Sequence, residues 1–233
     1  MTQPVIHRVT ALDLGFQPRP WPFADERRAE IAAHFAVKQR ETPIWNGRVL
    51  LGRDPVFTAE SLRASYFETD FASFLAWRDW GFPDAGVFNG FGMGALRSSD
   101  GAFVLGEMGQ HTANAGRIYF PAGTPDPDDL RGDAVDIAGS IAREVEEETG
   151  LTPADYRADA HWDCVVSGSA LAIIQILDVD LTGEALRTRI EANLARQEQP
   201  ELSALHLVRA PRDLSAAMPR FVTAFLEKHF ELE

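Results

Sequence analysis

The nine residues REVEEETGL, Arg143–Leu151, say most about the kind of protein this chain forms. They place three acids, Glu144, Glu147 and Glu148, at a spacing that puts all three on one face of a helix. Like charges on one helical turn repel each other and destabilise an isolated helix. A divalent cation that needs several carboxylate oxygens at once is one reason to keep them. Gly150 predicts the end of the helix, because glycine readily takes the left-handed conformation of a C-terminal cap.

The rest of this helix indicates where the acids point. On a helical wheel at about 100° per residue, its apolar residues form one stripe: Ile137, Ala138, Ile141 and Val145. Glu144 and Glu148 lie at the edge of this stripe, and Glu147 lies just beyond it. Carboxylates at the rim of a core favour a hard cation with oxygen ligands, Mg²⁺ or Mn²⁺. The alternative without a metal is a solvated, glutamate-rich surface helix.

Composition is that of an ordinary soluble globular protein, long enough at 233 residues to bury a sizeable core. The net charge of −13 argues against nucleic acid and against an anionic membrane surface as partners. No run of about 18 apolar residues predicts a membrane span, and the first residues show no signal-peptide pattern. Cys164 is the only cysteine, so no internal disulfide forms and a cytoplasmic location is expected.

Apolar patterning predicts strands before and after the acidic helix and further helices behind them. The expected strands cover residues 86–97, 102–108, 116–120, 161–166, 170–179 and 204–208. Asp136 is expected to cap the acidic helix, and helices are expected at residues 183–197 and 211–230, with Pro219 as a break. This order predicts an α/β fold with a mixed sheet covered on both faces. Residues 1–85 are expected to form an N-terminal extension, and residues 86–233 the main domain.

The pattern Arg-Glu-apolar-x-Glu-Glu-x-Gly-apolar over Arg143–Leu151 resembles the signature of the Nudix hydrolases. The resemblance implies an α/β/α sandwich over roughly residues 86–230. It also implies the hydrolysis of a diphosphate bond in a small nucleoside diphosphate derivative, with Mg²⁺ or Mn²⁺ as the cofactor. The first 85 residues lie outside the resemblance and could form a dimer surface or a lid.

Transferred by position, the resemblance implies that Glu144, Glu147 and Glu148 are metal ligands, with the carbonyl group of Gly123 close to the ion. Arg143 would orient a neighbouring carboxylate through a bidentate pair. The base that activates water is either Glu147 or an acid of a later loop. The later candidates are Glu184, Glu198 and Glu201.

Two features depart from the family pattern. The pattern has a further glutamate eight residues before the arginine, where this chain has Val135. Asp133 and Asp136 are the candidates to substitute for it, although Asp136 is better placed as the helix cap. The loop over residues 124–135 is also longer than in the family, either as a substrate-specific feature or as a harmless surface excursion.

The segment GRIYFP, residues 116–121, resembles the one before the signature in Nudix coenzyme A diphosphatases. Coenzyme A or an acyl-CoA is therefore an alternative substrate, although the upstream arginines of that group have no counterpart here. Arg117 and Phe120 are the candidates for contact with the substrate. A second class of function is a nucleotide-binding sensor or regulator that has lost catalysis, and turnover would distinguish it from an enzyme.

Overall fold

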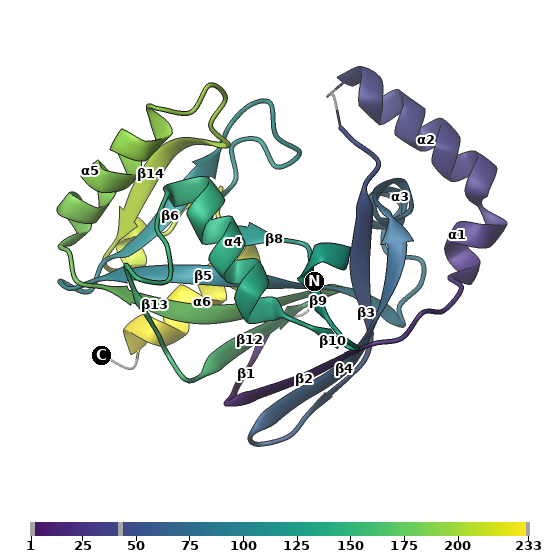
Figure 1. Cartoon of the computed structure of the whole chain (residues 1–233), viewed down its shortest axis with the longest axis horizontal. Helices are drawn as coiled ribbons and strands as arrows, with labels where there is room; N and C mark the ends of the chain where they lie inside the picture. Colours follow the sequence, from purple (N-terminus) through teal and green to yellow (C-terminus); the bar gives the residue numbers. More distant parts are fainter. Residues whose placement is uncertain (1–2, 42–43, 232–233) are drawn as a thin grey trace.

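The computed structural model describes residues 3–41 and 44–231. Its main strands lie side by side in the order β1-β12-β13-β5-β3-β4-β2-β10-β9 (Figure 1). The strands are β1 (Val5–Val9), β2 (Ala11–Phe16), β3 (Arg48–Phe57), β4 (Ser61–Asp70), β5 (Val87–Ser98), β6 (Phe103–Met108), β7 (Ile118–Tyr119), β8 (Ala122–Gly123), β9 (Leu130–Arg131), β10 (Ala134–Val135), β11 (Arg157–Ala158), β12 (Trp162–Ser167), β13 (Ala170–Val179) and β14 (Leu202–Val208). The helices are α1 (Pro22–Glu26), α2 (Arg28–Glu41), α3 (Phe71–Asp79), α4 (Ile137–Thr149), α5 (Gly183–Leu194) and α6 (Arg220–Glu231), with 3-10 helices η1 (Pro127–Asp129) and η2 (Pro211–Asp213).

The parallel pair β5–β13 forms the centre of the sheet, and its neighbours β3 and β12 run antiparallel to it. Both central strands are buried along most of their length, as expected of strands that are covered on two faces. One face packs against α4 and α5, and the other packs against α6. The predicted α/β fold, a mixed sheet between layers of helices, is confirmed. No helix in the described part of the chain is long and apolar enough to span a membrane.

Helix α4 lies unusually close to β5 because two glycines of the strand face it. A Cβ atom on Gly92 would lie 2.6 Å from Ile141, and one on Gly94 would lie 2.6 Å from Val145. Real Cβ atoms essentially never approach other atoms so closely, so these glycines set the height of α4 above the sheet. Both predicted caps are confirmed. The Asp136 side chain accepts a hydrogen bond from the Gly139 amide, and Gly150 ends the helix with φ of 73°.

The antiparallel pair β3–β4 has a core on each of its faces. Leu50 and Tyr66 point into the core beneath α4, whereas Leu51 and Phe67 point into a second core with Trp21. Strand β3 also pairs with β5, and β1 pairs with β12. Strands from both sides of position 85 therefore share one hydrogen-bonded sheet, and the division of the chain at that position stays a prediction.

Several local expectations are corrected. Strand β3 is continuous from Arg48 to Phe57, with an irregularity between Arg53 and Val56. Asp54 has φ of 55° there, so the irregularity accommodates Pro55, which has no N–H to donate. Ala138 is exposed rather than part of the buried stripe. The helix expected over residues 211–230 is shorter, because α6 begins at Arg220, directly after Pro219, and only residues 211–213 before it form a 3-10 helix, η2.

Residues 124–135, expected as an open loop, are tied into the sheet. The Leu50 amide donates to the carbonyl of Pro125 at 2.7 Å, and the Phe16 amide donates to the carbonyl of Asp133 at 2.7 Å. Strand β10 pairs with β2 through Ala134. The longer loop is therefore held by β2 and β3, which both belong to the N-terminal residues.

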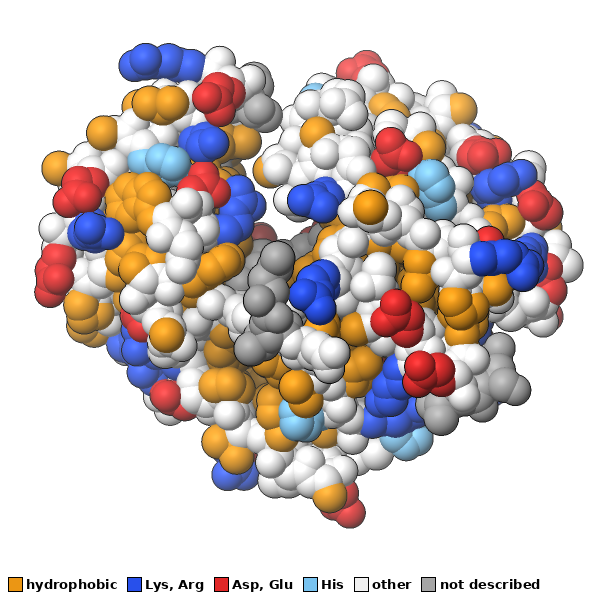
Figure 2. Space-filling view, turned by 180° about the vertical axis from the view of Figure 1, so that it is seen from behind, with side chains coloured by type: hydrophobic (Ala, Val, Ile, Leu, Met, Phe, Trp, Pro, Cys, Tyr) orange, Lys and Arg blue, Asp and Glu red, His pale blue; other side chains and the backbone are white. Residues whose placement is uncertain are grey.

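Seen from behind, the surface is notched between the part built around α1–α3 and the rest of the molecule (Figure 2). Lys and Arg side chains lie along the edges of this notch in that view. The strands β3 and β4 connect the two parts, since each of the cores they face belongs to one part. The notch therefore does not divide the sheet, which runs without interruption through β3 and β4.

Candidate functional site

Helix α4 places two of its acids over the end of β8. Glu148 is only 5% exposed, and one of its carboxylate oxygens accepts a hydrogen bond from the Ala122 amide at 3.3 Å. The Glu144 side chain, 18% exposed, lies so close to Gly123 that a Cβ atom there would overlap its carboxylate. Gly123 is held in place by pairing with Gly92 of β5. The carboxylate of Glu144 thus occupies the space that a side chain at position 123 would need.

Burial and mutual repulsion change the protonation of these two acids. Burial raises the pKa of Glu148 to about 8, and the charge of Glu144 contributes to this rise. Burial likewise raises the pKa of Glu144 to about 7, against the lowering effect of Arg143. Near neutral pH the pair therefore tends to hold protons unless a positive charge compensates it. A buried and a half-buried carboxylate side by side, with Arg143 as their partial compensation, are a donor set suited to a hard cation.

Arg143 is held by an acid that the sequence analysis did not select. Its guanidinium group donates to both carboxylate oxygens of Asp129, at 2.5 and 3.2 Å, and Asp129 is only 2% exposed. The same guanidinium group lies 3.4 Å from a carboxylate oxygen of Glu144. The Asp129 carboxylate raises the pKa of Arg143, which keeps the positive charge in place. The expected bidentate pair of Arg143 is therefore present.

Neither of the two acids proposed in place of the family glutamate contacts Arg143 through its side chain. Asp136 caps α4, Asp133 is exposed, and Val135 packs in the core beneath α4. The sequence DPDD, residues 126–129, is the local pattern that could have indicated Asp129, because aspartate followed by proline favours a tight turn. That turn is η1, and it directs Asp129 inward.

The third acid of the helix, Glu147, is exposed, and its backbone carbonyl accepts a hydrogen bond from the Gln197 side chain at 3.1 Å. Within residues 3–41 and 44–231, no three His, Cys, Asp or Glu side chains converge as a ready-made metal site. The structure thus brings Glu144 and Glu148 together and leaves Glu147 outside the pair. Mg²⁺ commonly binds through one or two carboxylates plus water and substrate phosphate, so the buried pair is compatible with that ion.

Two further residues face the buried pair from β7 and from the loop before β14. The charge of Glu201 contributes to the raised pKa of both Glu144 and Glu148, so Glu201 lies near them. Tyr119 has a strongly raised pKa, first through burial and then through the charges of Glu148, Glu201 and Glu144. Its hydroxyl group accepts a hydrogen bond from the Asn114 side chain at 3.1 Å. Sequence reasoning missed Tyr119, because nothing local indicates that β7 ends beside α4.

The remaining candidates fall outside this cluster. Glu184 forms an ion pair with Arg187 on the outer face of α5. Phe120 is fully buried, with its ring packed against Phe103 and Phe225. The expectation that Phe120 contacts a substrate is therefore wrong: its side chain completes the core under α6. Arg117 is exposed, and its contact with a substrate stays a prediction.

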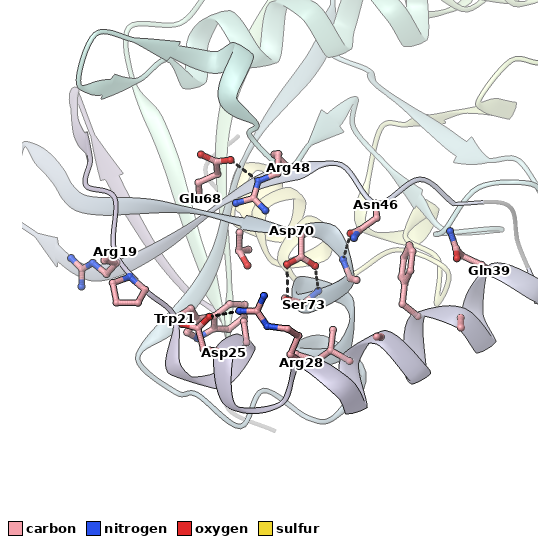
Figure 3. Close-up of a pocket in the computed structure, with 18 residues that line it drawn as sticks. Arg19, Trp21, Asp25, Arg28, Gln39, Asn46, Arg48, Glu68, Asp70 and Ser73 are labelled. Atoms are coloured by element: carbon pink, nitrogen blue, oxygen red, sulfur yellow. Dashed lines mark hydrogen bonds and ion pairs between the residues drawn. The ribbon is translucent and has the colours of Figure 1, made fainter.

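A separate pocket of about 530 Å³ opens between α2 and the strands β3 and β4 (Figure 3). Its polar side chains largely satisfy one another. Arg48 pairs with Glu68 at 2.5 Å, and the Asp70 carboxylate accepts hydrogen bonds from the amide and hydroxyl groups of Ser73. None of the acids of α4 lines this pocket, so it is distinct from the cluster around Glu144 and Glu148.

Comparison with known proteins gives partial likenesses. No protein-family model matches the chain, and no curated protein matches it. Among solved structures, the Nudix hydrolase RenU from M. smegmatis is 14% identical, covers 63% of this chain and 88% of its own, and has a TM-score of 0.42. The MutT protein from Methanosarcina mazei Go1 is 18% identical, covers 62% of this chain and 94% of its own, and has a TM-score of 0.36.

A third solved structure is the bifunctional NMN adenylyltransferase/ADP ribose pyrophosphatase from Francisella tularensis. It is 12% identical, with 68% of this chain and 45% of that chain covered and a TM-score of 0.39. RenU is named as a member of the family that residues 143–151 resemble. Likenesses this distant do not fix a function, which has to follow from the side chains of the site.

Proposed function

We propose that this protein is a metal-dependent hydrolase that cleaves the diphosphate bond of a nucleoside diphosphate derivative. The buried pair of Glu144 and Glu148 above Gly123 is the observation that carries the proposal. Two neighbouring buried carboxylates are costly in the absence of a compensating charge. A divalent cation and its phosphate ligand would supply that charge and complete the coordination.

In this proposal the residues of the chain have distinct tasks. Glu144, Glu148 and the carbonyl group of Gly123 would hold Mg²⁺ or Mn²⁺, with Glu147 as a further ligand when substrate is bound. Such an ion neutralises a diphosphate and lowers the pKa of a water molecule. Arg143 keeps the Glu144 carboxylate oriented through its contact at 3.4 Å.

The proton of the attacking water needs an acceptor close to the buried pair. The charges of Glu147 and Glu201 act on both Glu144 and Glu148, and Glu198 is an exposed residue of the loop before β14. Glu201 is favoured, because Glu147 is already assigned as a further ligand of the ion. Tyr119, whose hydroxyl group accepts from Asn114, keeps its own proton free to donate to a phosphate oxygen.

The decisive experiment measures the two phosphomonoester products of diphosphate-bond hydrolysis by chromatography, with Mg²⁺ and then with Mn²⁺, across nucleoside diphosphate derivatives. The panel includes nucleotide sugars, dinucleotides, coenzyme A and acyl-CoA, so it also tests the alternative substrate class. We expect one class to be hydrolysed and Glu148→Gln to abolish the activity. Glu146→Gln, an exposed position of the same helix, is the matched control and should hydrolyse normally. Normal turnover in Glu144→Gln and Glu148→Gln would contradict the assigned site.

The second candidate function is a sensor that binds a nucleotide diphosphate with metal but does not hydrolyse it. The exposed position of Glu147 favours it, because one acid of the signature then lies outside the cluster. Calorimetric titration in the presence of Mg²⁺ separates the two functions. Tight metal-dependent binding without hydrolysis products would identify the sensor, whereas hydrolysis that depends on Glu148 would exclude it.

A further inference from the structure

The loop that supplies Asp129 is anchored at both ends by strands of the N-terminal residues. On one side the carbonyl of Pro125 accepts from Leu50 of β3, and on the other the carbonyl of Asp133 accepts from Phe16 of β2. Both hydrogen bonds measure 2.7 Å. Backbone hydrogen bonds to two different strands restrict the loop far more than one contact would.

Within this loop the carboxylate of Asp129 is surrounded by donors. The Asp126 amide donates to one of its oxygens at 3.0 Å, and Arg143 donates to both. The backbone of Asp129 is held as well, because its carbonyl accepts from the Asp136 amide at 2.9 Å. A buried carboxylate with this many charge-assisted and backbone partners has one defined orientation.

The guanidinium group of Arg143 lies between the carboxylates of Asp129 and Glu144, and it binds Asp129 more tightly. Its Nη2 atom is 3.2 Å from Asp129 and 3.4 Å from Glu144, while Nη1 binds Asp129 alone at 2.5 Å. The bidentate pair with Asp129 therefore prevents Arg143 from swinging fully onto Glu144. A guanidinium group paired fully with Glu144 would compete with a cation for the same carboxylate oxygens.

We propose that Asp129 is a positioning residue that acts through Arg143 to keep Glu144 above Gly123 and available to a divalent cation. Strands β2 and β3 of the N-terminal residues take part in the site, because they hold the loop that presents Asp129. This inference rests on the proposed function for its kinetic consequences. Its consequence for the binding of the metal alone can be measured separately.

The first test compares Asp129→Asn with Asp133→Asn, an exposed aspartate of the same loop. Mn²⁺ affinity is measured by electron paramagnetic resonance, and kcat and KM are measured on the hydrolysed substrate. We expect Asp129→Asn to weaken Mn²⁺ binding by about 10-fold or more, as partners of ligand residues commonly do. We expect Asp133→Asn to bind Mn²⁺ like the wild type. Unchanged Mn²⁺ affinity in folded Asp129→Asn overturns the inference.

A double-mutant cycle tests whether Asp129 acts through Arg143. In an Arg143→Gln background, Asp129→Asn should change Mn²⁺ affinity by less than about twofold, because the intermediary is already missing. Effects that multiply in the double variant would overturn the inference. A general loss of stability cannot imitate the expected result, since it would act in both backgrounds.

Asp129 is buried, so melting curves accompany each variant. If Asp129→Asn does not fold, Asp129→Glu replaces it in the test, because it keeps the charge and displaces it by one methylene group. Unchanged Mn²⁺ affinity in Asp129→Glu would also overturn the inference.

The proposed function and the role of Asp129 are contradicted by different results. Wild-type protein that binds Mn²⁺ but hydrolyses nothing in the panel contradicts the enzyme and leaves the Asp129 measurement valid. Wild-type protein that does not bind Mn²⁺ overturns both.

Discussion

At the scale of single residues, Glu148 shows how the fold changes a side chain. It is a glutamate of helix α4 that is only 5% exposed to water. Burial first, and then the charge of Glu144, raises its pKa from 4.5 to about 8. The acid therefore opposes folding when it is ionised and supports binding of a cation, which requires the ionised form.

The pH dependence of stability follows from this shift. Because the folded-state pKa exceeds the unfolded one, the contribution of Glu148 is fully present below about pH 4.5 and is lost as the pH rises through about 8. In the presence of a chelator, we expect the melting temperature of the wild type to fall relative to Glu148→Gln between pH 5 and 8, by on the order of 5 °C. The same pH dependence of the melting temperature in the two proteins would refute this prediction. Added Mn²⁺ should reverse the fall in the melting temperature of the wild type.

The identity of the base is also a question of single residues. We expect Glu201→Gln to lower kcat by about 100-fold or more and to leave Mn²⁺ affinity nearly unchanged. The reason is that the charge of Glu201 acts on Glu144 and Glu148, while Glu147, whose charge acts on them as well, is assigned to the metal in the proposed function. Glu184→Gln, at an acid paired with Arg187 on the outer face of α5, is the control. If Glu147→Gln alone abolishes turnover and Glu201→Gln does not, Glu147 is the base.

At the scale of elements, the position of α4 depends on two glycines of β5. Neither Gly92 nor Gly94 has a positive φ, so each is needed for space and not for backbone conformation. The helix carries Glu144 and Glu148, so any rise of α4 from the sheet moves both acids away from Gly123 of β8. The packing of one helix on one strand thus determines the geometry of the site.

Gly92→Ala tests this dependence directly. The new methyl group would lie 2.6 Å from Ile141 and 3.1 Å from Ile137, so α4 has to shift. We expect a loss of about 1–3 kcal/mol in the free energy of unfolding and a clear loss of turnover. Gly15→Ala, where the nearest atom would be 4.0 Å away, should have little effect in the same urea titration. Equal stability of the two variants would show that α4 can be displaced freely.

At the scale of the whole molecule, the N-terminal residues and the residues around α4 share both a sheet and a core. Leu50 and Leu62 lie in the same core cluster as Ile137 and Leu171. Strands β2 and β3 also hold the loop that carries Asp129. A division of the chain at residue 85 would therefore separate strands that are hydrogen-bonded to each other and expose one side of the core.

A fragment of residues 86–233 tests that division. If residues 1–85 are a separable extension, the fragment folds alone and binds Mn²⁺ with normal affinity. Because β3 pairs with β5 and β1 pairs with β12, we expect instead a fragment without a cooperative melting transition. Circular dichroism on heating provides the measurement, and the intact chain is the control. A sharp transition in the fragment would support the division.

The sequence alone determined those features that depend on neighbours along the chain. Asp136, Gly150 and the spacing of the three glutamates predicted helix α4, its two ends and its acidic face, because caps and helical faces are set within a few residues. The order of strands and helices predicted the α/β layers, since buried faces must be covered. The resemblance carried by Arg143–Leu151 added the expected chemistry.

The tertiary structure decided what depends on contacts between distant segments. Only folding shows that Asp129, not Asp133 or Asp136, pairs with Arg143, and that Phe120 is a core residue. It also shows that strands β1, β2 and β3 join residues 1–85 to the later part of the chain, through β12, β10 and β5. Such contacts depend on the register and packing of segments far apart in sequence, which local periodicity does not encode. The same packing, by excluding water, shifts the pKa of Glu144 and Glu148.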